Sequence, residues 1–362
     1  MKKHSILFII NYLDLGGAGK MLKYVANLCS AHFRKVTVLT LDEPYRSTDL
    51  NPKVEHVTLR YKEGRGMFWR LMQTHRLRKL INSISPDIVC PFVSDVCFLS
   101  RVAAYGLKAK FVSAERGDPY TKNKVWDVMM RWTYNHSDYC FFQLPQARDY
   151  YGKRVSKKSF VIPNVFVQEK DITPYFGERK KTIVSAGRFV AEKRYEILIS
   201  AFAIVHEAHP EYKMILYGEG PFLEQYKQQA ERLGISGLIE YPGYVKGVAK
   251  AIREDGVFVL SSRYEGIPNS LIEALSIGIP CVSTDCTPGG PRFLTKDGNN
   301  GLLVPVDDVD AMADSINTII ENAELANRLS ELGPTILSEL SDDVISKKWI
   351  EAFGSILELN TM

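Results

Sequence analysis

Two carboxylates have the type and spacing that could act on a phosphate-bearing substrate. Glu265 and Glu273 are eight residues apart, and Glu265 follows an apolar stretch that ends at Ser262. Pro268 suits the first position of a helix, which places Glu265 in a loop and Glu273 in the second helical turn. The start of that helix is an anion site, because its first amides have no partner within the helix. The pattern predicts two carboxylates beside a phosphate-binding helix end. In the alternative interpretation, Glu265 is a helix-entry charge and Glu273 lies on a solvated helix face.

Two cations lie in a second loop, directly after another apolar run. Arg188 and Lys193 are five residues apart, and Gly187 before them lets the backbone turn sharply. A guanidinium binds a diphosphate as a fork and an ammonium binds it as a point charge. The loop therefore predicts a diphosphate clamp, with ordinary solvated surface charges as the alternative.

Glycine-rich turns follow further apolar runs. Gly16 and Gly17 follow the first run, and Gly218, Glu219 and Tyr244 lie in later turns of the same kind. The amides of such turns can bind phosphate. The first turn lacks the GxGxxG spacing, so a bound dinucleotide is not expected and no cofactor is predicted.

Short β-rich runs alternate with helical patterns in two series, which predicts an α/β fold with two parallel sheets. The expected strands of the first series are 5–11, 36–40, 54–59, 87–92, 111–114, 139–143 and 160–162. Those of the second are 182–186, 213–217, 239–241, 257–260, 281–284 and 302–304. A polar, proline-containing stretch separates the series, so we expect domains at 1–170 and 171–362. Because parallel sheets bind ligands at the carboxyl ends of their strands, two such Rossmann-like domains would face a common cleft.

The tail after residue 307 has helical spacing almost throughout, with a break at Gly333 and Pro334. Its last part carries Val344, Trp349 and Phe353, an apolar set that has to dock on a core. One expected docking place for this last helix is the first domain.

Composition excludes several classes of protein. The chain of 362 residues is 45% hydrophobic and 24% charged, which is typical of a folded enzyme. Its first apolar run is too short for a signal peptide or a bilayer span. The six cysteines show neither CxxC pairs nor zinc spacing, and Asp308 to Asp310 fits a helix cap, so no metal is expected. These features indicate a cytoplasmic protein.

The net charge of +4 hides a strong asymmetry. Residues 1–170 carry 28 Lys and Arg against 14 Asp and Glu, whereas residues 171–362 carry 18 against 28. A basic half is compatible with nucleic acid, an anionic membrane or a phosphate-bearing acceptor. No helix-turn-helix, zinc or RNP-like signature occurs, so nucleic acid is not expected as a partner.

The segment 60–79 is basic and aromatic. On a helical wheel, Phe68, Leu71 and Met72 lie opposite Leu77 and Ile81, which fit a core-facing side. A second apolar and basic face of this kind can lie on an anionic membrane, which would make the protein peripheral on the inner face of the cytoplasmic membrane. A solvated basic face with covered aromatic side chains is the equal alternative.

Seven ordered motifs resemble the family-four (group 1) retaining glycosyltransferases of the GT-B fold, of the type that assembles polysaccharides and lipid-linked glycans. The matching residues are Gly16-Gly17, Ile162-Pro163-Asn164, Gly187-Arg188 with Glu192-Lys193, Gly218-Glu219-Gly220-Pro221, Gly243-Tyr244, the Glu265 and Glu273 pair, and Asn300 to Pro305. The resemblance covers essentially the whole chain. It implies a nucleotide-diphosphate sugar held by the C-terminal domain and an acceptor held by the N-terminal domain.

The resemblance also implies roles for individual residues. Arg188 and Lys193 would bind the diphosphate and stabilise the leaving group, Glu265 would contact sugar hydroxyls, and Glu273 would contact the ribose. The donor site would be completed by Gly16, Gly17, Gly187, Gly218, Glu219, Tyr244, Gly266, Ile267, Asn269, Ser270 and Glu273. Two fixed cations and a helix dipole would replace a divalent metal.

One motif departs from the family pattern. Many members have a histidine after the fifth strand of the first domain, whereas this chain has Glu115 and Arg116, as some polysaccharide-assembly relatives do. These two residues are candidates for contact with the sugar or acceptor. A local ion network with Asp118 is the alternative.

The expected function is transfer of a hexose or N-acetylhexosamine, with UDP as the expected nucleotide, to a glycan acceptor of the lipid-linked kind. Lipopolysaccharide or capsule biosynthesis is the expected setting. A nucleotide-sugar hydrolase or epimerase-like enzyme, or a catalytically silent sugar-nucleotide-binding protein, remains the alternative on the same fold.

Overall fold

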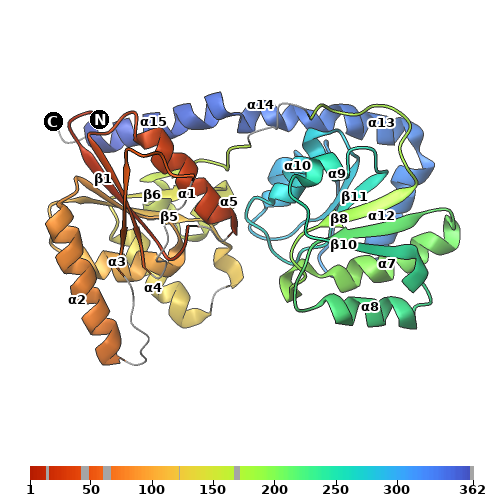
Figure 1. The fold of residues 1–362 in the computed structure, drawn as a ribbon, viewed down its shortest axis with the longest axis horizontal. Coiled ribbons are helices and arrows are strands. Elements are labelled where there is room, and N and C mark those ends of the chain that lie inside the picture. Colours follow the sequence, from red (N-terminus) through yellow and green to blue (C-terminus); the bar gives the residue numbers. More distant parts are fainter. Residues whose placement is uncertain (14–15, 42–48, 60–66, 122, 167–171, 359–362) are drawn as a thin grey trace. The chain divides into compact units, whose positions relative to one another are not determined.

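The computed structural model describes residues 1–13, 16–41, 49–59, 67–121, 123–166 and 172–358. The chain divides into two compact units, and each is described by itself (Figure 1). The first unit comprises Met1–Val165 and Asp342–Met362, and the second comprises Phe166–Ser341. The domain boundary expected at residues 170 and 171 lies outside the described residues.

The first unit is built on seven parallel strands in the order β3-β2-β1-β4-β5-β6-β7. Their bounds are β1 Ser5–Ile10, β2 Lys35–Thr40, β3 Val54–Thr58, β4 Ile88–Pro91, β5 Lys110–Glu115, β6 Tyr139–Phe142 and β7 Ser159–Val161. All six residues of β1 are buried. Helices cover both faces of a parallel sheet, so a strand buried between them is a continuous apolar run.

Helices cover both faces of this sheet. The bounds in the first unit are α1 Gly16–Cys29, α2 Met67–Ile84, α3 Ser94–Ala103, the 3₁₀ turn η1 Pro119–Thr121, α4 Lys124–Asn135, α5 Pro145–Tyr150, α6 Lys153–Ser156 and α15 Asp342–Glu358. In Figure 1, α1 and α15 lie above the sheet, and α2, α3 and α4 lie below it. The two apolar cores support this arrangement. One contains residues of α1 and α15, and the other contains residues of α2 and α3.

The C-terminal helix α15 belongs to the first unit. Trp349 and Phe353 are fully buried, and the Trp349 ring lies 4.6 Å from that of Phe141 and 6.1 Å from that of Phe92. Tyr24 of α1 donates a hydrogen bond of 2.7 Å to Asp342 at the start of α15. Aromatic packing of this extent fixes the helix on the sheet.

The second unit has six parallel strands in the order β10-β9-β8-β11-β12-β13. Its strands are β8 Thr182–Ala186, β9 Lys213–Tyr217, β10 Ile239–Gly243, β11 Val257–Leu260, β12 Cys281–Thr284 and β13 Leu302–Val304. Its helices are α7 Tyr195–Ala208, α8 Leu223–Arg232, α9 Val248–Ala251, α10 Asn269–Ser276, α11 Gly290–Leu294, α12 Val309–Glu321, α13 Ala323–Leu332 and α14 Leu337–Leu340. The 3₁₀ turns are η2 Ala191–Lys193, η3 Ser236–Leu238 and η4 Gly333–Ile336.

The predicted fold class is confirmed, and all thirteen expected strands occur within a residue or two of their expected bounds. Two local expectations differ. Gly16 and Gly17 form the first helical turn of α1 rather than a loop. Pro268 is the N-cap of α10 and Asn269 is its first residue, because the extended backbone of Pro268 (φ −74°, ψ 113°) precedes the helix. Among the described helices, none is long and apolar enough to span a bilayer.

Candidate functional site

The predicted site residues of the second unit gather at one edge of its sheet. Chain order in this sheet reverses between β8 and β11, and such a switch point opens a crevice at the carboxyl ends of the strands. Gly187 follows β8, and the loop of Glu265 follows β11. Residues that are far apart in sequence therefore meet at the place where this fold binds ligands.

Lys193 and Glu265 form an ion pair between Nζ and Oε1. Their side chains are only 17% and 16% exposed, so water screens the pair less than it would on an open surface. Ser262 donates a second hydrogen bond to the same Oε1 at 2.8 Å, and the amide of Glu265 donates to the carbonyl of Thr287 at 2.9 Å. The carboxylate is thus fixed through one oxygen.

Arg188 remains largely in solvent. Its side chain is 78% exposed, and its Nη2 lies 3.9 Å from Oε1 of Glu192. A guanidinium with so weak an intramolecular contact is available to an anion that approaches the edge.

The glycine turns hold the neighbouring strand ends together. The amide of Gly187 donates to Tyr217 at 2.9 Å, and that of Gly218 donates to Gly243 at 2.9 Å. Gly218 has φ 147°, and a Cβ there would overlap the carbonyl of Gly187, so the turn requires glycine. Glu219 is exposed and accepts a 3.5 Å hydrogen bond from the amide of Tyr244.

The start of α10 completes this edge. Gly266 is half-buried and Ile267 is buried, whereas Asn269 is exposed and Ser270 is half-buried. Glu273 is half-buried in the second turn, as predicted. A Cβ on Gly290 would overlap the carbonyl oxygen of Gly266, so the loop of α10 and the start of α11 approach as closely as glycine allows.

Sequence reasoning missed several contributors to this site. Ser262 ends the motif that was recognised, but only the folded chain shows that its hydroxyl holds Glu265. Asp307 binds Arg194 at 2.6 Å and Arg263 at 2.8 Å, which ties the two loops together. Partial burial raises the pKa of Asp307, but the hydrogen bonds from Arg263 and Arg194 outweigh this and hold it below its usual value. No local motif signals such contacts.

In the first unit, Gly16 and Gly17 lie at the N-terminus of α1, the helix that follows β1. Chain order in this sheet reverses between β1 and β4, so the two glycines also lie at a switch point. A Cβ on Gly19 would overlap the carbonyl of Leu13, which explains the third glycine of the motif.

Glu115 ends β5 and is 1% exposed. Its carboxylate accepts hydrogen bonds from Tyr134 at 2.9 Å, from Tyr151 at 3.3 Å and from the amide of Gly117 at 2.9 Å. Burial, followed by the charge of Glu115, raises the pKa of both tyrosines. Glu115 therefore fixes the loop after β5 from within.

Arg116 turns to different partners. Its Nη1 donates to the carbonyl of Ile162 at 3.1 Å, and its guanidinium stacks 4.9 Å from the Phe92 ring and 5.3 Å from the Trp349 ring. Burial lowers its pKa to about 9. Within the described residues, Nε and Nη2 have no hydrogen-bond partner. Among the described residues, the hydrogen bonds of Arg116 and of the Glu115 carboxylate go to different partners and not to each other.

Other polar groups have structural roles. Asp308 caps α12 by accepting from the amide of Ala311 at 2.9 Å, as its sequence context predicts. Across the described ranges, no three His, Cys, Asp or Glu side chains are grouped so that they could hold a metal ion.

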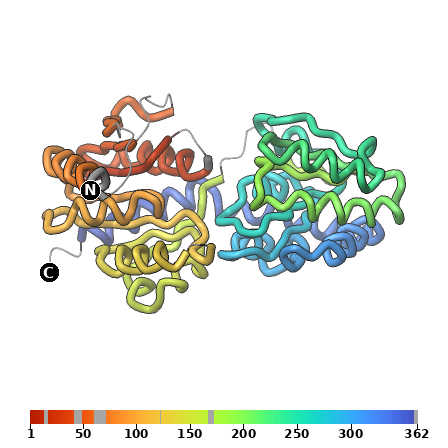
Figure 2. Tube along the Cα trace, turned by 90° about the horizontal axis from the view of Figure 1, so that it is seen from below, coloured from red at the N-terminus to blue at the C-terminus, as the bar shows by residue number. Residues whose placement is uncertain are grey.

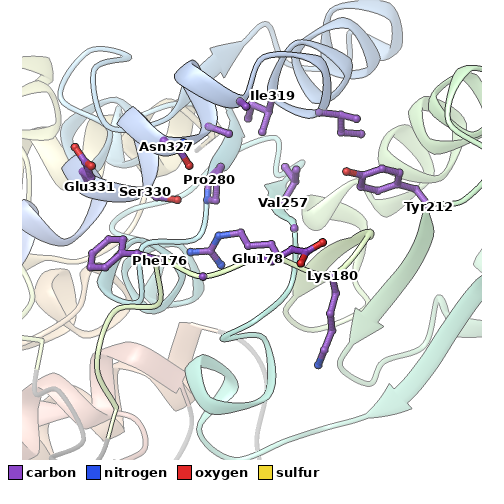
Figure 3. Close-up of a pocket in the computed structure, with 16 residues that line it drawn as sticks. Phe176, Glu178, Lys180, Tyr212, Val257, Pro280, Ile319, Asn327, Ser330 and Glu331 are labelled. Atoms are coloured by element: carbon purple, nitrogen blue, oxygen red, sulfur yellow. The ribbon is translucent and has the colours of Figure 1, made fainter.

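A cavity of about 460 Å³ lies at the opposite edge of the second sheet (Figure 3). Phe176, Tyr212 and Val257 line it, together with residues of α12 and α13. The guanidinium of Arg179 in its wall donates to four backbone carbonyls, those of Tyr175, Arg253, Asp255 and Gly278. Because it lies at the amino ends of the strands, this cavity is separate from the candidate site at their carboxyl ends.

Comparison with known proteins agrees with this geometry. The family model of the glycosyl transferases group 1 matches residues 168–335. The chain is 24% identical to the GalNAc-alpha-(1->4)-GalNAc-alpha-(1->3)-diNAcBac-PP-undecaprenol alpha-1,4-N-acetyl-D-galactosaminyltransferase of Campylobacter jejuni, over 97% of this chain and 99% of that protein. It is 21% identical to the amylovoran biosynthesis glycosyltransferase of Erwinia amylovora, over 96% and 98% of the two chains.

Solved structures show the same fold. The Anabaena protein HepE in complex with UDP and glucose superimposes with a TM-score of 0.78 at 18% identity, over 97% of this chain and 100% of that one. The lipopolysaccharide outer core galactosyltransferase WaaB gives a TM-score of 0.79 at 20% identity, over 98% and 100%. Residues 168–335 belong to the group 1 family of glycosyl transferases, and the chain has the GT-B fold.

Proposed function

We propose that this glycosyltransferase moves a hexose or N-acetylhexosamine from a UDP-sugar to a lipid-linked glycan acceptor, with retention of configuration and without a metal ion. The observation that carries the proposal is the Lys193–Glu265 pair at the switch point of the second sheet, with exposed Arg188 close by in sequence and the start of α10 directly after Glu265. A fixed cation, an exposed guanidinium and the first amides of a helix suit a diphosphate.

The two members of the pair have complementary roles in this proposal. The ammonium of Lys193 and the guanidinium of Arg188 oppose the charge that develops on the departing diphosphate. Both hydrogen bonds to the Glu265 side chain fall on Oε1, which leaves Oε2 for a sugar hydroxyl. Glu273 contacts the ribose, and the amides at the start of α10 complete the binding of phosphate.

Several printed names support the choice of donor and acceptor. HepE was solved with UDP and glucose, and the Campylobacter relative is named for an undecaprenol-linked acceptor. A relative in Rhizobium meliloti, 31% identical over 48% of this chain, is named for lipopolysaccharide core biosynthesis. We infer surface polysaccharide biosynthesis on the cytoplasmic side as the setting.

In the first unit, we propose Arg116 as the contact with sugar or acceptor and Glu115 as a positioning residue. Two donors of Arg116 have no partner among the described residues, whereas the Glu115 carboxylate is buried and already accepts three hydrogen bonds. An anionic or hydroxyl-rich ligand would satisfy these donors.

A thermal-shift panel of UDP, GDP, ADP and duplex DNA tests the nucleotide part of this proposal. A ligand that binds only the folded state raises the melting temperature by mass action. UDP should raise it, and more than GDP or ADP. Stabilisation by DNA alone would contradict the assignment.

A further inference from the structure

Two residues with a left-handed backbone are paired at the edge that carries the candidate site. Among the described residues, five other than glycine have a positive φ, and two of these, Arg194 (φ 52°) and Asp307 (φ 63°), form an ion pair with each other. A Cβ makes this conformation unfavourable, so it persists only where the surrounding contacts hold it. Because such strain is concentrated at functional sites, the pair is a candidate for a functional role.

The carboxylate of Asp307 bridges two arginines. Its Oδ1 accepts from Nε of Arg194 at 2.6 Å, and its Oδ2 accepts from Nη2 and Nε of Arg263 at 2.8 Å and 3.2 Å. Arg194 is the N-cap of α7, Arg263 follows β11, and Asp307 follows β13. The colours of these three segments in Figure 2 run from green through cyan to blue, so one carboxylate ties together loops that are far apart along the chain.

Both arginines adjoin the ion pair of the candidate site. Arg194 follows Lys193 directly, and Arg263 lies two residues before Glu265. The amide of Arg263 also donates to the carbonyl of Glu192 at 2.8 Å, so the two loops lie against each other. An ammonium and two guanidiniums are thus carried on adjoining loops, where each is an available partner for the Glu265 carboxylate.

Asp307 decides which cation pairs with Glu265. A guanidinium binds a carboxylate through two parallel hydrogen bonds, so a released arginine would displace the ammonium of Lys193. Arg194 also pairs with Glu196, which leaves Arg263 as the guanidinium that depends more on Asp307. Glycine would adopt the backbone of residue 307 without strain, so the carboxylate is the feature that favours aspartate there.

We propose that Asp307 is a positioning residue for the donor reaction. It holds Arg194 and Arg263 away from Glu265, so that Glu265 pairs with Lys193 alone. The inference rests on the proposed function, because it concerns the order of the charges that oppose the departing diphosphate. Asp307 acts through this pair and needs no contact with the donor.

This role predicts that turnover and nucleotide binding respond differently when the carboxylate is removed. Two released guanidiniums add positive charge at the edge, so the affinity for UDP should be unchanged or higher. Mispairing of Glu265 disturbs the arrangement that the transition state requires, so turnover should fall. A residue that only stabilised the loop would lower turnover, UDP affinity and melting temperature together.

The variant Asp307→Gly tests this difference, since glycine keeps the left-handed backbone and only the carboxylate is lost. Its melting temperature should stay close to that of the parent, because relief of the backbone offsets the loss of two partly exposed ion pairs. Titration calorimetry with UDP should give at least the affinity of the parent. Release of UDP from UDP-glucose, UDP-galactose or their N-acetyl analogues, with a lipid-linked glycan as acceptor, should be roughly tenfold slower or more.

Asp297→Gly is the matched control. Asp297 also has a left-handed backbone (φ 55°) and an arginine partner, Arg292 at 3.3 Å, but it precedes β13 whereas Asp307 follows this strand. The same chemical change should there leave turnover and UDP affinity at the values of the parent.

A second variant separates positioning from a structural role. Arg263→Gln added to Asp307→Gly removes the released guanidinium and should restore much of the turnover. Failure of this rescue, a parallel fall of turnover and UDP affinity in Asp307→Gly, or turnover within a few-fold of the parent would overturn the proposal. A parent that neither binds UDP nor releases it from any of these donors would instead contradict the proposed function, and this inference with it.

Discussion

At the scale of single residues, Lys193 and Glu265 fix each other at the edge where the nucleotide is proposed to bind. Their pairing joins loops that are 72 residues apart, and Ser262 holds the carboxylate from the other side. Because the charges are already oriented, little reorganisation is needed when the leaving group develops charge. Preorganisation of this kind predicts larger effects on turnover than on ground-state binding.

Replacement of Lys193 or Arg188 by alanine should therefore lower turnover by on the order of a hundredfold while changing donor affinity less. Steady-state rates and UDP affinity, measured for both variants, separate the two quantities. Lys180→Ala at the opposite edge of the same sheet is the control, because its exposed side chain pairs with the surface residue Glu254 at 3.5 Å and lies away from the candidate site. Turnover within a few-fold of the parent would rule out the clamp.

The carboxylates predict two different kinetic signatures. Glu265→Gln keeps the shape but loses the charge that fixes Lys193, so transfer should collapse while the protein stays folded. Glu273→Gln should mainly raise the KM for the donor, because a ribose contact is shared by the ground and transition states. Glu254→Gln, at an exposed position of the same unit, serves as the control. Full activity of Glu265→Gln would remove this residue from the mechanism.

At the scale of elements, the site depends on close backbone approach between the loop of α10 and the start of α11. Gly290 touches the carbonyl of Gly266 so closely that no side chain fits between them. After Gly266, the chain passes through Ile267 and Pro268 into α10, the helix whose first amides are proposed to bind phosphate. The position of that helix start is therefore coupled to a single glycine.

Gly290→Ala should displace the loop of Gly266 and weaken UDP binding, with a smaller loss of thermal stability than of affinity. Titration calorimetry with UDP and a melting curve measure the two effects. Gly237→Ala is the matched control, since a Cβ there meets no atom within 4 Å. If Gly290→Ala bound UDP as tightly as the control, the close approach would have no part in the site.

The elements were largely predictable from sequence, and their tertiary contacts were not. Buried strands such as β8 and β11 are continuous apolar runs between turn residues, which local patterning reveals. The Lys193–Glu265 pair and the role of Gly290 depend on contacts between distant segments, and no local pattern encodes them. The last helix was expected to dock, yet only the folded chain shows that Arg116 stacks on its Trp349.

At the scale of the whole molecule, the charge asymmetry of the sequence corresponds to its division into two units. The basic half of the sequence forms most of the first unit, and the acidic half contains the proposed donor site. Arg188, whose side chain is 78% exposed, places a positive charge at this edge of an otherwise acidic unit, where a diphosphate would be repelled without cations.

The most direct test of the central claim is release of UDP from UDP-sugars, measured with and without a lipid-linked glycan acceptor. The account predicts release that depends on the acceptor, persists in EDTA, and yields a product whose anomeric configuration matches the donor. Release that is equally fast without the acceptor would show a hydrolase. No release from any UDP-hexose or UDP-N-acetylhexosamine would contradict the proposed donor.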